Sequence, residues 1–121
     1  SYWGDFRSFC AKRTKAAGVV IDGAFRDVEE CREIGFPIFA RAVTCPTAAK
    51  NGTGQMNVPV DCGGVRVQPG DLIVGDENGV CVIDPKEAEA IMEKAEKKRA
   101  AQERTMREME ETGVLYTRIK K

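Results

Sequence analysis

Residues 18–27 read Gly-Val-Val-Ile-Asp-Gly-Ala-Phe-Arg-Asp, and this stretch decides the fold. The run Val19-Val20-Ile21 is apolar and β-branched, which is typical of a strand buried on both faces. Asp22-Gly23 follows directly and indicates that the strand ends in a tight turn served by the Asp22 side chain. The sequence therefore predicts a buried strand that needs helices or strands on both sides.

Helical sequence lies on either side of this strand. We predict a helix from Tyr2 to Ala17 that ends at Gly18, and a short helix from Asp27 to Ile34 that ends at Gly35. A second strand, Pro37 to Ala40, follows. The alternation of helix with buried strand indicates an α/β or α+β fold.

Residues 44–57 contain proline, asparagine and glycine and read as a loop of about fourteen residues, a length that is often functional. We expect this loop to line a site or an interface. Four short β runs separated by glycine turns come next and predict hairpins in a compact β unit. They are Val58–Val60, Gly64–Val67, Asp71–Gly75 and Val80–Ile83.

A long C-terminal helix is predicted over residues 85–112, with Asp84 as N-cap and Pro85 at its first position. Pairs such as Glu93/Lys97 support it. Its apolar stripe is thin, so its outer turns are either solvated or packed on another subunit. We read residues 1–121 as one domain of the α/β (α+β) class.

The composition excludes several function classes. Nineteen basic and nineteen acidic side chains cancel, so no net field draws the chain onto nucleic acid or a membrane surface. Five cysteines without a C-x-x-C pair indicate reduced thiols and a cytoplasmic protein. The absence of histidine excludes Ser-His-Asp and Cys-His catalysis. Chemistry must therefore use carboxylates, Arg, Lys, backbone amides or a bound metal.

Two polar clusters are candidates for a site. Arg26 and Asp27 follow the first strand, where α/β folds place ligands, and pair an anion fork with an oxygen ligand for Mg²⁺ or Mn²⁺. The alternative is that Asp27 is only a helix N-cap and Arg26 its surface neighbour. Gly4-Asp5 precedes the first helix, where free amides bind carboxylates, although Asp5 can equally be a plain cap.

A series of motifs resembles the family that includes 4-hydroxy-4-methyl-2-oxoglutarate aldolase and the regulator of ribonuclease activity A. No single motif is distinctive, but their order and spacing run over nearly the whole chain. They are Gly4-Asp5, Ala11-Lys12, residues 18–27, residues 35–41, residues 57–60, Gly63-Gly64-Val65, Pro69-Gly70-Asp71 and residues 76–80.

The resemblance implies a swivelling β/β/α domain of the RraA-like type, assembled as a homotrimer or hexamer with sites between subunits. It also implies that this chain is the C-terminal portion, preceded in family members by a further N-terminal segment. The sequence departs from the family at Phe6-Arg7, where members commonly carry two small aliphatic residues. That departure puts the identity of the substrate in doubt.

The resemblance further implies the site residues. Amides of Gly4, Asp5, Phe6 and Arg7, together with Arg26, would bind pyruvate oxygens, and Asp27 would anchor Mg²⁺ or Mn²⁺. Asp5 would order a proton-carrying water, Glu30 is the acidic residue three positions beyond the metal ligand, and Glu103 of a neighbouring subunit's C-terminal helix would complete the site.

The implied reaction is metal-dependent cleavage of 4-hydroxy-4-methyl-2-oxoglutarate-type 2-oxo acids to pyruvate, with oxaloacetate decarboxylation as a related activity. The alternative is a non-enzymatic regulator that binds an RNA-degradation enzyme. Both would share one fold, and Arg26, Asp27 and Glu30 together favour the enzyme.

Overall fold

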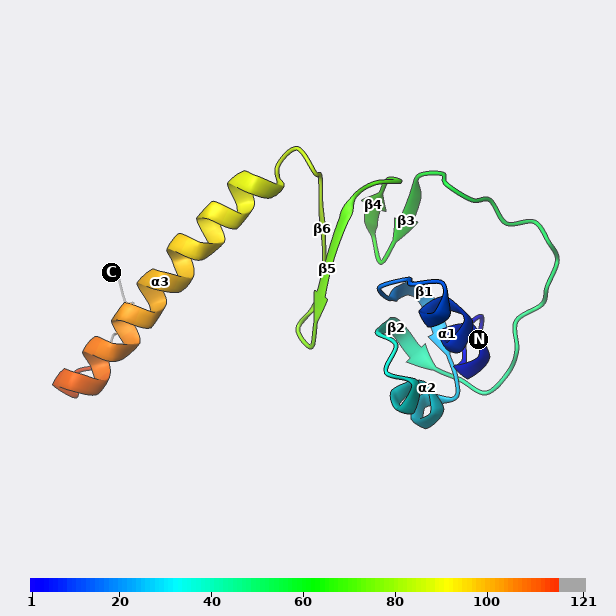
Figure 1. Cartoon of the computed structure of the whole chain (residues 1–121), viewed down its shortest axis with the longest axis horizontal. Coiled ribbons are helices and arrows are strands. Elements are labelled where there is room, and N and C mark those ends of the chain that lie inside the picture. The colour runs from blue at the N-terminus through cyan, green and yellow to red at the C-terminus, as the bar shows by residue number, and fades with distance from the viewer. Residues whose placement is uncertain (116–121) are drawn as a thin grey trace. The chain divides into compact units, whose positions relative to one another are not determined.

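Strands β1, Val19–Phe25, and β2, Ile38–Val43, form a parallel pair at the centre of the first part of the chain (Figure 1). Parallel neighbours need a crossover, and helix α2, Val28–Ile34, supplies it. The computed structural model describes residues 1–115. It divides the chain into two units, Ser1–Val82 and Ile83–Lys121.

Strand β1 continues past the predicted turn. Its register with β2 shifts between Ile21 and Ala24, which absorbs the Asp22-Gly23 step without ending the strand. The Asp22 carboxylate accepts the Gly63 amide at 2.9 Å and pairs with Arg41 of β2. The prediction of a turn was wrong, because these partners hold Asp22 in the strand.

Helix α1 spans Asp5–Arg13 and is shorter than the predicted helix from Tyr2 to Ala17. Tyr2 and Trp3 are extended because they pair with the edge of β1: the Tyr2 amide bonds the Ala24 carbonyl at 3.3 Å, and the Arg26 amide bonds the Trp3 carbonyl at 3.0 Å. Lys15 adopts a positive φ of 64° and stops the helix before Gly18.

Helix α2 was predicted well, with Asp27 at its N-cap position and Gly35 at its C-cap. It packs against α1 around a small core, in which Cys31 and Phe36 are the buried apolar residues of the described chain. The Phe36 ring stacks on Trp3, with centroids 6.0 Å apart. The strand pair is not covered on both faces, since Val20 stays 39% exposed.

The connection after β2 contains neither helix nor strand over residues 44–57, as predicted (Figure 1). It continues to residue 59, because the strand predicted at Val58–Val60 begins only at Val60. The β runs that follow pair as two hairpins. Strands β3 and β4 are antiparallel, and β5 pairs with β6. Their bounds are β3 Val60–Cys62, β4 Val65–Val67, β5 Leu72–Asp76 and β6 Gly79–Ile83.

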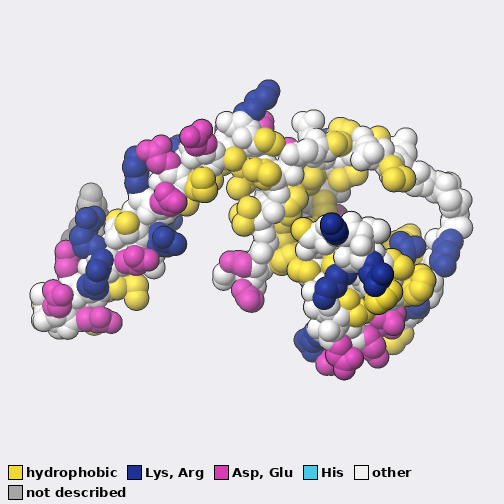
Figure 2. Space-filling model, in the orientation of Figure 1, with side chains coloured by type: hydrophobic (Ala, Val, Ile, Leu, Met, Phe, Trp, Pro, Cys, Tyr) yellow, Lys and Arg dark blue, Asp and Glu magenta, His cyan; other side chains and the backbone are white. Residues whose placement is uncertain are grey.

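Most apolar side chains of these hairpins remain exposed, so the predicted compact β unit is not built from residues 58–82 alone. Figure 2 shows hydrophobic side chains gathered over the strands of the first unit. One close contact is made where Phe39 lies over Gly75: a Cβ at position 75 would come within 2.6 Å of the ring. Only glycine fits there.

Helix α3, Ala88–Thr112, has no buried residue along its 25 positions. It begins three residues after the predicted start, because the Asp84 carboxylate accepts the Lys86 amide at 2.9 Å and holds residues 85–87 in a turn. Charged side chains of both signs are spread along its visible face, with hydrophobic side chains between them (Figure 2). No helix within residues 1–115 has both the length and the apolar character needed to cross a bilayer.

Candidate functional site

A pocket of about 150 Å³ lies where β1 ends and α1 begins. Its walls come from three segments that are far apart in the sequence: the start of the chain through α1, the end of β1, and the loop after β2. Its lining includes Gly4, Asp5, Phe6, Arg7, Arg26, Asp27, Thr47 and Lys50.

Arg26 lies at the centre of these segments. Its backbone amide bonds the Trp3 carbonyl, which fixes where the side chain begins. Its guanidinium contacts Asp27 through Nε, 3.4 Å from Oδ2, and donates from Nη1 to the Thr47 hydroxyl. With its side chain 43% exposed, Arg26 is both held and open to a ligand.

Asp27 stands at the N-cap position of α2, but its side chain makes no capping hydrogen bond there. Its backbone adopts the left-handed conformation, with φ 59° and ψ 50°, which non-glycine residues seldom use. The carboxylate turns instead toward α1, where Oδ2 accepts the Asp5 amide at 3.4 Å. The alternative of Asp27 as a plain N-cap therefore explains its backbone but not its side chain.

Gly4 allows this approach. It is buried, and a Cβ at this position would clash with Asp27 Oδ2 and lie 3.3 Å from Arg26 Cγ. The backbone of Gly4 can therefore lie against the two polar side chains only because it has no side chain of its own.

Two of the amides expected to be free at the start of α1 have partners within the chain. The Asp5 amide faces Asp27, and the Phe6 amide donates to Asp5 Oδ1 at 2.6 Å. Asp5 thus also acts as the first-turn carboxylate of its own helix. A bound anion would exchange with these carboxylates.

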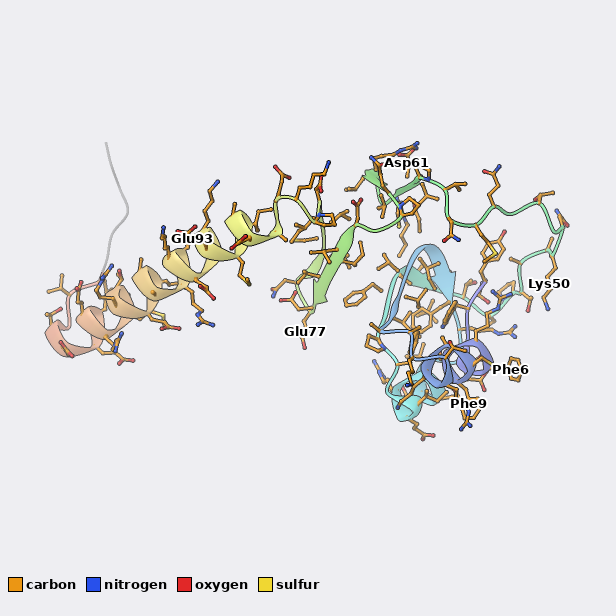
Figure 3. The ribbon with its side chains drawn as sticks, turned by 45° about the horizontal axis from the view of Figure 1, so that its top comes forward. Phe6, Phe9, Lys50, Asp61, Glu77 and Glu93 are labelled. Atoms are coloured by element: carbon orange, nitrogen blue, oxygen red, sulfur yellow. The ribbon has the colours of Figure 1, made fainter. Side chains whose placement is uncertain are left out.

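Phe6 and Arg7 also line the pocket. Phe6 is 76% exposed and projects from α1 (Figure 3). The two remaining predicted residues do not line it. Glu30 is exposed on α2, and Glu103 lies on α3 in the second unit, where Arg99 is 3.6 Å away.

A second, more open hollow of about 380 Å³ shares Arg26 and Asp27 with the first pocket. Its other walls are less polar and come from Val28, Val43, Thr44 and Cys45. The Arg26-Asp27 pair is therefore reached from two hollows.

The carboxylates around the pocket can supply part of a divalent-metal site. Within residues 1–115, no three Asp, Glu, Cys or His side chains gather as a complete metal site. Mg²⁺, however, is commonly held by one or two carboxylates, with waters and substrate oxygens as its other ligands. Asp27 faces the pocket with its side chain 33% exposed, so it fits as such a protein ligand.

Thr47 and Lys50 were not predicted individually. The length of the loop from Thr44 to Asn57 indicated that this segment is functional. The sequence did not show which of its side chains lies near β1. Backbone hydrogen bonds decide this, because the Thr44 amide bonds the Phe25 carbonyl at 3.0 Å. That contact brings the first residues of the loop to the end of β1.

Comparison with known proteins places this geometry in a family. A family model described as Aldolase/RraA matches residues 1–82, which contain the whole pocket. The chain belongs to the RraA-like family. The resemblance found in the sequence is therefore confirmed, together with the mixed α/β fold and its long C-terminal helix.

Members of the RraA-like family that the chain matches carry different descriptions. A protein provisionally named 4-hydroxy-4-methyl-2-oxoglutarate aldolase in Halalkalibacterium halodurans is 48% identical over 83% of this chain and 48% of its own length. An uncharacterized protein of Methanocaldococcus jannaschii is 46% identical over 93% of this chain and 56% of its own.

A solved RraA-like structure extends the comparison. A Streptomyces coelicolor protein, described as an unusual member of the RNase ES inhibitor RraA family, aligns with a TM-score of 0.80 and 33% identity. The alignment covers 89% of this chain and 56% of that one. The chain spans about half the length of the curated relatives it matches.

Proposed function

We propose that the pocket is the pyruvate-binding part of a divalent-metal-dependent aldolase site. The observation that carries the proposal is the convergence of Arg26 and Asp27 with the start of α1 on one small pocket. An arginine fork can bind a substrate carboxylate, and a carboxylate that makes no capping hydrogen bond can hold Mg²⁺ beside it, which suits a metal-assisted 2-oxo acid site.

Arg26 would bind the substrate carboxylate. Its guanidinium presents several donors in one plane, which suits the two oxygens of a carboxylate better than an ammonium does. Amides from Gly4 to Arg7 would bind the neighbouring oxygen in place of their present contacts with the Asp5 and Asp27 carboxylates. The 2-oxo acid would then lie along the edge of Gly4.

Asp27 would hold Mg²⁺ or Mn²⁺. Glu30 of α2 would support Asp27 without binding the metal itself. When bound, such a metal supplies Lewis-acid polarisation of the 2-oxo group. The substrates proposed are 4-hydroxy-4-methyl-2-oxoglutarate and related 2-oxo acids.

Cleavage would remove the proton of the 4-hydroxyl group and break the C3–C4 bond. C4 then becomes the keto carbon of one pyruvate, and the electron pair of the bond stays on C3 as the enolate of a second pyruvate. Protonation at C3 then releases pyruvate. Asp5 would hold the water that carries this proton, and Glu103 of a neighbouring subunit would complete the site. Decarboxylation of oxaloacetate would break the equivalent C3–C4 bond, release C4 as CO2 and leave the same pyruvate enolate for protonation at C3.

Support for this activity comes from the aldolase name of the Halalkalibacterium relative. The test is pyruvate release from both substrates with Mg²⁺, before and after EDTA, in the parent and in Arg26→Lys. We expect EDTA to abolish turnover and the variant to lose about 10- to 150-fold in kcat/KM, equivalent to ~1.5–3 kcal/mol for a charged hydrogen bond. Arg32→Lys is the matched control, since Arg32 pairs with Glu29 on the surface. Turnover that survives metal removal would reject the proposal.

A regulator that binds an RNA-degradation enzyme is the second candidate. It is favoured by the RNase inhibitor description of the Streptomyces structure. Binding to such an enzyme that is unaffected by Arg26→Lys, with no pyruvate release by the parent, would support this second candidate.

The proposed assembly is a cytoplasmic homotrimer or hexamer. Exposed apolar strand residues such as Leu72, Ile73 and Val74 support it, since they are 45–58% exposed in the single chain. Sedimentation that gives a concentration-independent monomer would exclude it.

A further inference from the structure

We propose that Thr47 is a positioning residue that fixes the Arg26 guanidinium for the substrate carboxylate. This deepens the proposed function and rests on it for the identity of the ligand. The structural part of the proposal concerns two side chains of this chain only and can be tested separately.

The guanidinium of Arg26 is held at two nitrogens. Asp27 lies against Nε, and the Thr47 hydroxyl accepts from Nη1. Among the described residues, no protein group accepts a hydrogen bond from Nη2, and Arg26 lines the pocket, so this nitrogen is available to a bound carboxylate. Two restraints on a planar group fix its rotation as well as its position, which one restraint cannot do.

Asp27 cannot supply this restraint alone. If it also binds a metal, its carboxylate is shared, and its contact with Arg26 Nε is already long at 3.4 Å. A neutral hydroxyl on a different segment keeps its partner when the charge around Asp27 changes. Thr47 therefore supplies the restraint that does not depend on metal.

The position of Thr47 is itself well defined. It lies between two backbone anchors of its loop: the Thr44 amide bonds the Phe25 carbonyl, and the Ala48 amide bonds the Ser1 carbonyl, both at 3.0 Å. Because both anchors close onto the segments that form the pocket, the hydroxyl is fixed relative to Arg26. The rest of the loop up to residue 57 carries Lys50, labelled in Figure 3.

The chain offers well-matched variants. Thr47→Val keeps the shape and removes the hydroxyl, whereas Thr47→Ser keeps the hydroxyl and removes the methyl group. Thr53→Val makes the same change in an exposed part of the same loop. The pair at position 47 separates the hydrogen bond from packing, and Thr53 controls for the loop.

The first readout is NMR of the Arg26 Nε–H group in the metal-free protein, assigned by its loss in Arg26→Lys. We expect Thr47→Val to lower its heteronuclear NOE and shift its resonance, while Thr47→Ser and Thr53→Val leave both unchanged. Equal order of this group in the parent and in Thr47→Val overturns the proposal, whatever the protein's activity.

The second readout is the affinity for pyruvate with Mg²⁺, measured by calorimetry. We expect Thr47→Val to weaken binding about fivefold to tenfold, because the lost hydrogen bond acts on the ligand only through Arg26, and Thr47→Ser to restore it. An ordered Arg26 in a parent that binds no pyruvate would leave Thr47 as a positioning residue and reject the proposed function instead. Thr47→Ser behaving like Thr47→Val would reject the role of the hydroxyl.

Discussion

Helices α1 and α3 differ sharply in how much of their surface is buried in this chain. Helix α1 has nine residues, yet it buries Ser8 completely and lies against Asp27, Trp3 and Cys31. Helix α3 has 25 residues and buries none of them in this chain. Length therefore says little about importance here, because tertiary contacts decide what a helix contributes.

The largest effect on activity is expected at Gly4, which directly precedes α1 and lies in close contact with the Asp27 carboxylate. Gly4→Ala adds a methyl group where Asp27 Oδ2 lies, and this carboxylate must leave the pocket. We expect pyruvate release to fall at least about 100-fold, a loss typical of a misplaced catalytic group. Thermal unfolding should change little, because a flexible carboxylate can move away. Gly54→Ala, where nothing lies within 4 Å, is the control.

Both helices contain a side-chain hydroxyl that donates a hydrogen bond to the backbone carbonyl four residues earlier. Removing each hydroxyl compares the two helices by their effect on stability. Ser8 Oγ donates to the Gly4 carbonyl at 2.9 Å and accepts Trp3 Nε1 at 2.8 Å, whereas Thr105 donates to the Ala101 carbonyl at 3.0 Å. Ser8→Ala leaves the Trp3 indole without its partner, so we expect a loss of about 1–3 kcal/mol in urea unfolding. Thr105→Val should cost well under half of that. Equal losses would erase the distinction between the helices.

Asp22 gives a pH-dependent test in the first unit. The Gly63 amide, and with it Arg41, holds the pKa of the Asp22 carboxyl below its ordinary value of 3.8. A lowered pKa means that the ionised form favours the folded state. This stabilisation is complete above about pH 4 and is lost as the pH falls through the folded-state pKa.

Urea unfolding between pH 2 and 6 measures this contribution. We expect Asp22→Asn to flatten the acid limb of the stability curve and to change α3 helicity little. Glu77→Gln, an exposed change in the β5–β6 turn, should leave the limb as it is (Figure 3). An unaltered acid limb in Asp22→Asn would remove Asp22 as its cause.

The smallest effect is expected on α3. Lys97 pairs with Glu93 at 2.5 Å, one turn away on an exposed surface (Figure 3). Such pairs are worth about 0.3–0.5 kcal/mol, so Lys97→Met should change the unfolding free energy by no more than that. A loss above 1 kcal/mol would mean that this face of α3 is packed on something in solution.

Much of the fold was readable from local sequence. Gly35 marked the end of α2, and β-branched runs marked the strands, because these signals act within a few residues. The helix from Tyr2 was misread because Tyr2 and Trp3 pair with β1, a contact more than twenty positions away. Asp22 was assigned to a turn for the same reason, since Gly63 and Arg41 are its partners.

The candidate site divides in the same way. Arg26, Asp27 and Gly4 were predicted because they directly follow a predicted strand or directly precede a predicted helix, so local sequence is enough to single them out. Thr47 was missed because its hydrogen bond with Arg26 depends on how a long loop folds back onto β1. A threonine in a loop has no local feature that indicates an arginine partner.

The most direct measurement uses Trp3, the one tryptophan of the chain, which lines the pocket. Titrating pyruvate with Mg²⁺ should change the Trp3 emission in a saturable way, and Arg26→Ala should abolish that change. Arg32→Ala, on the surface of α2, should titrate like the parent. An emission that does not respond to pyruvate, or that responds equally in Arg26→Ala, would contradict the assignment of this pocket as the pyruvate site.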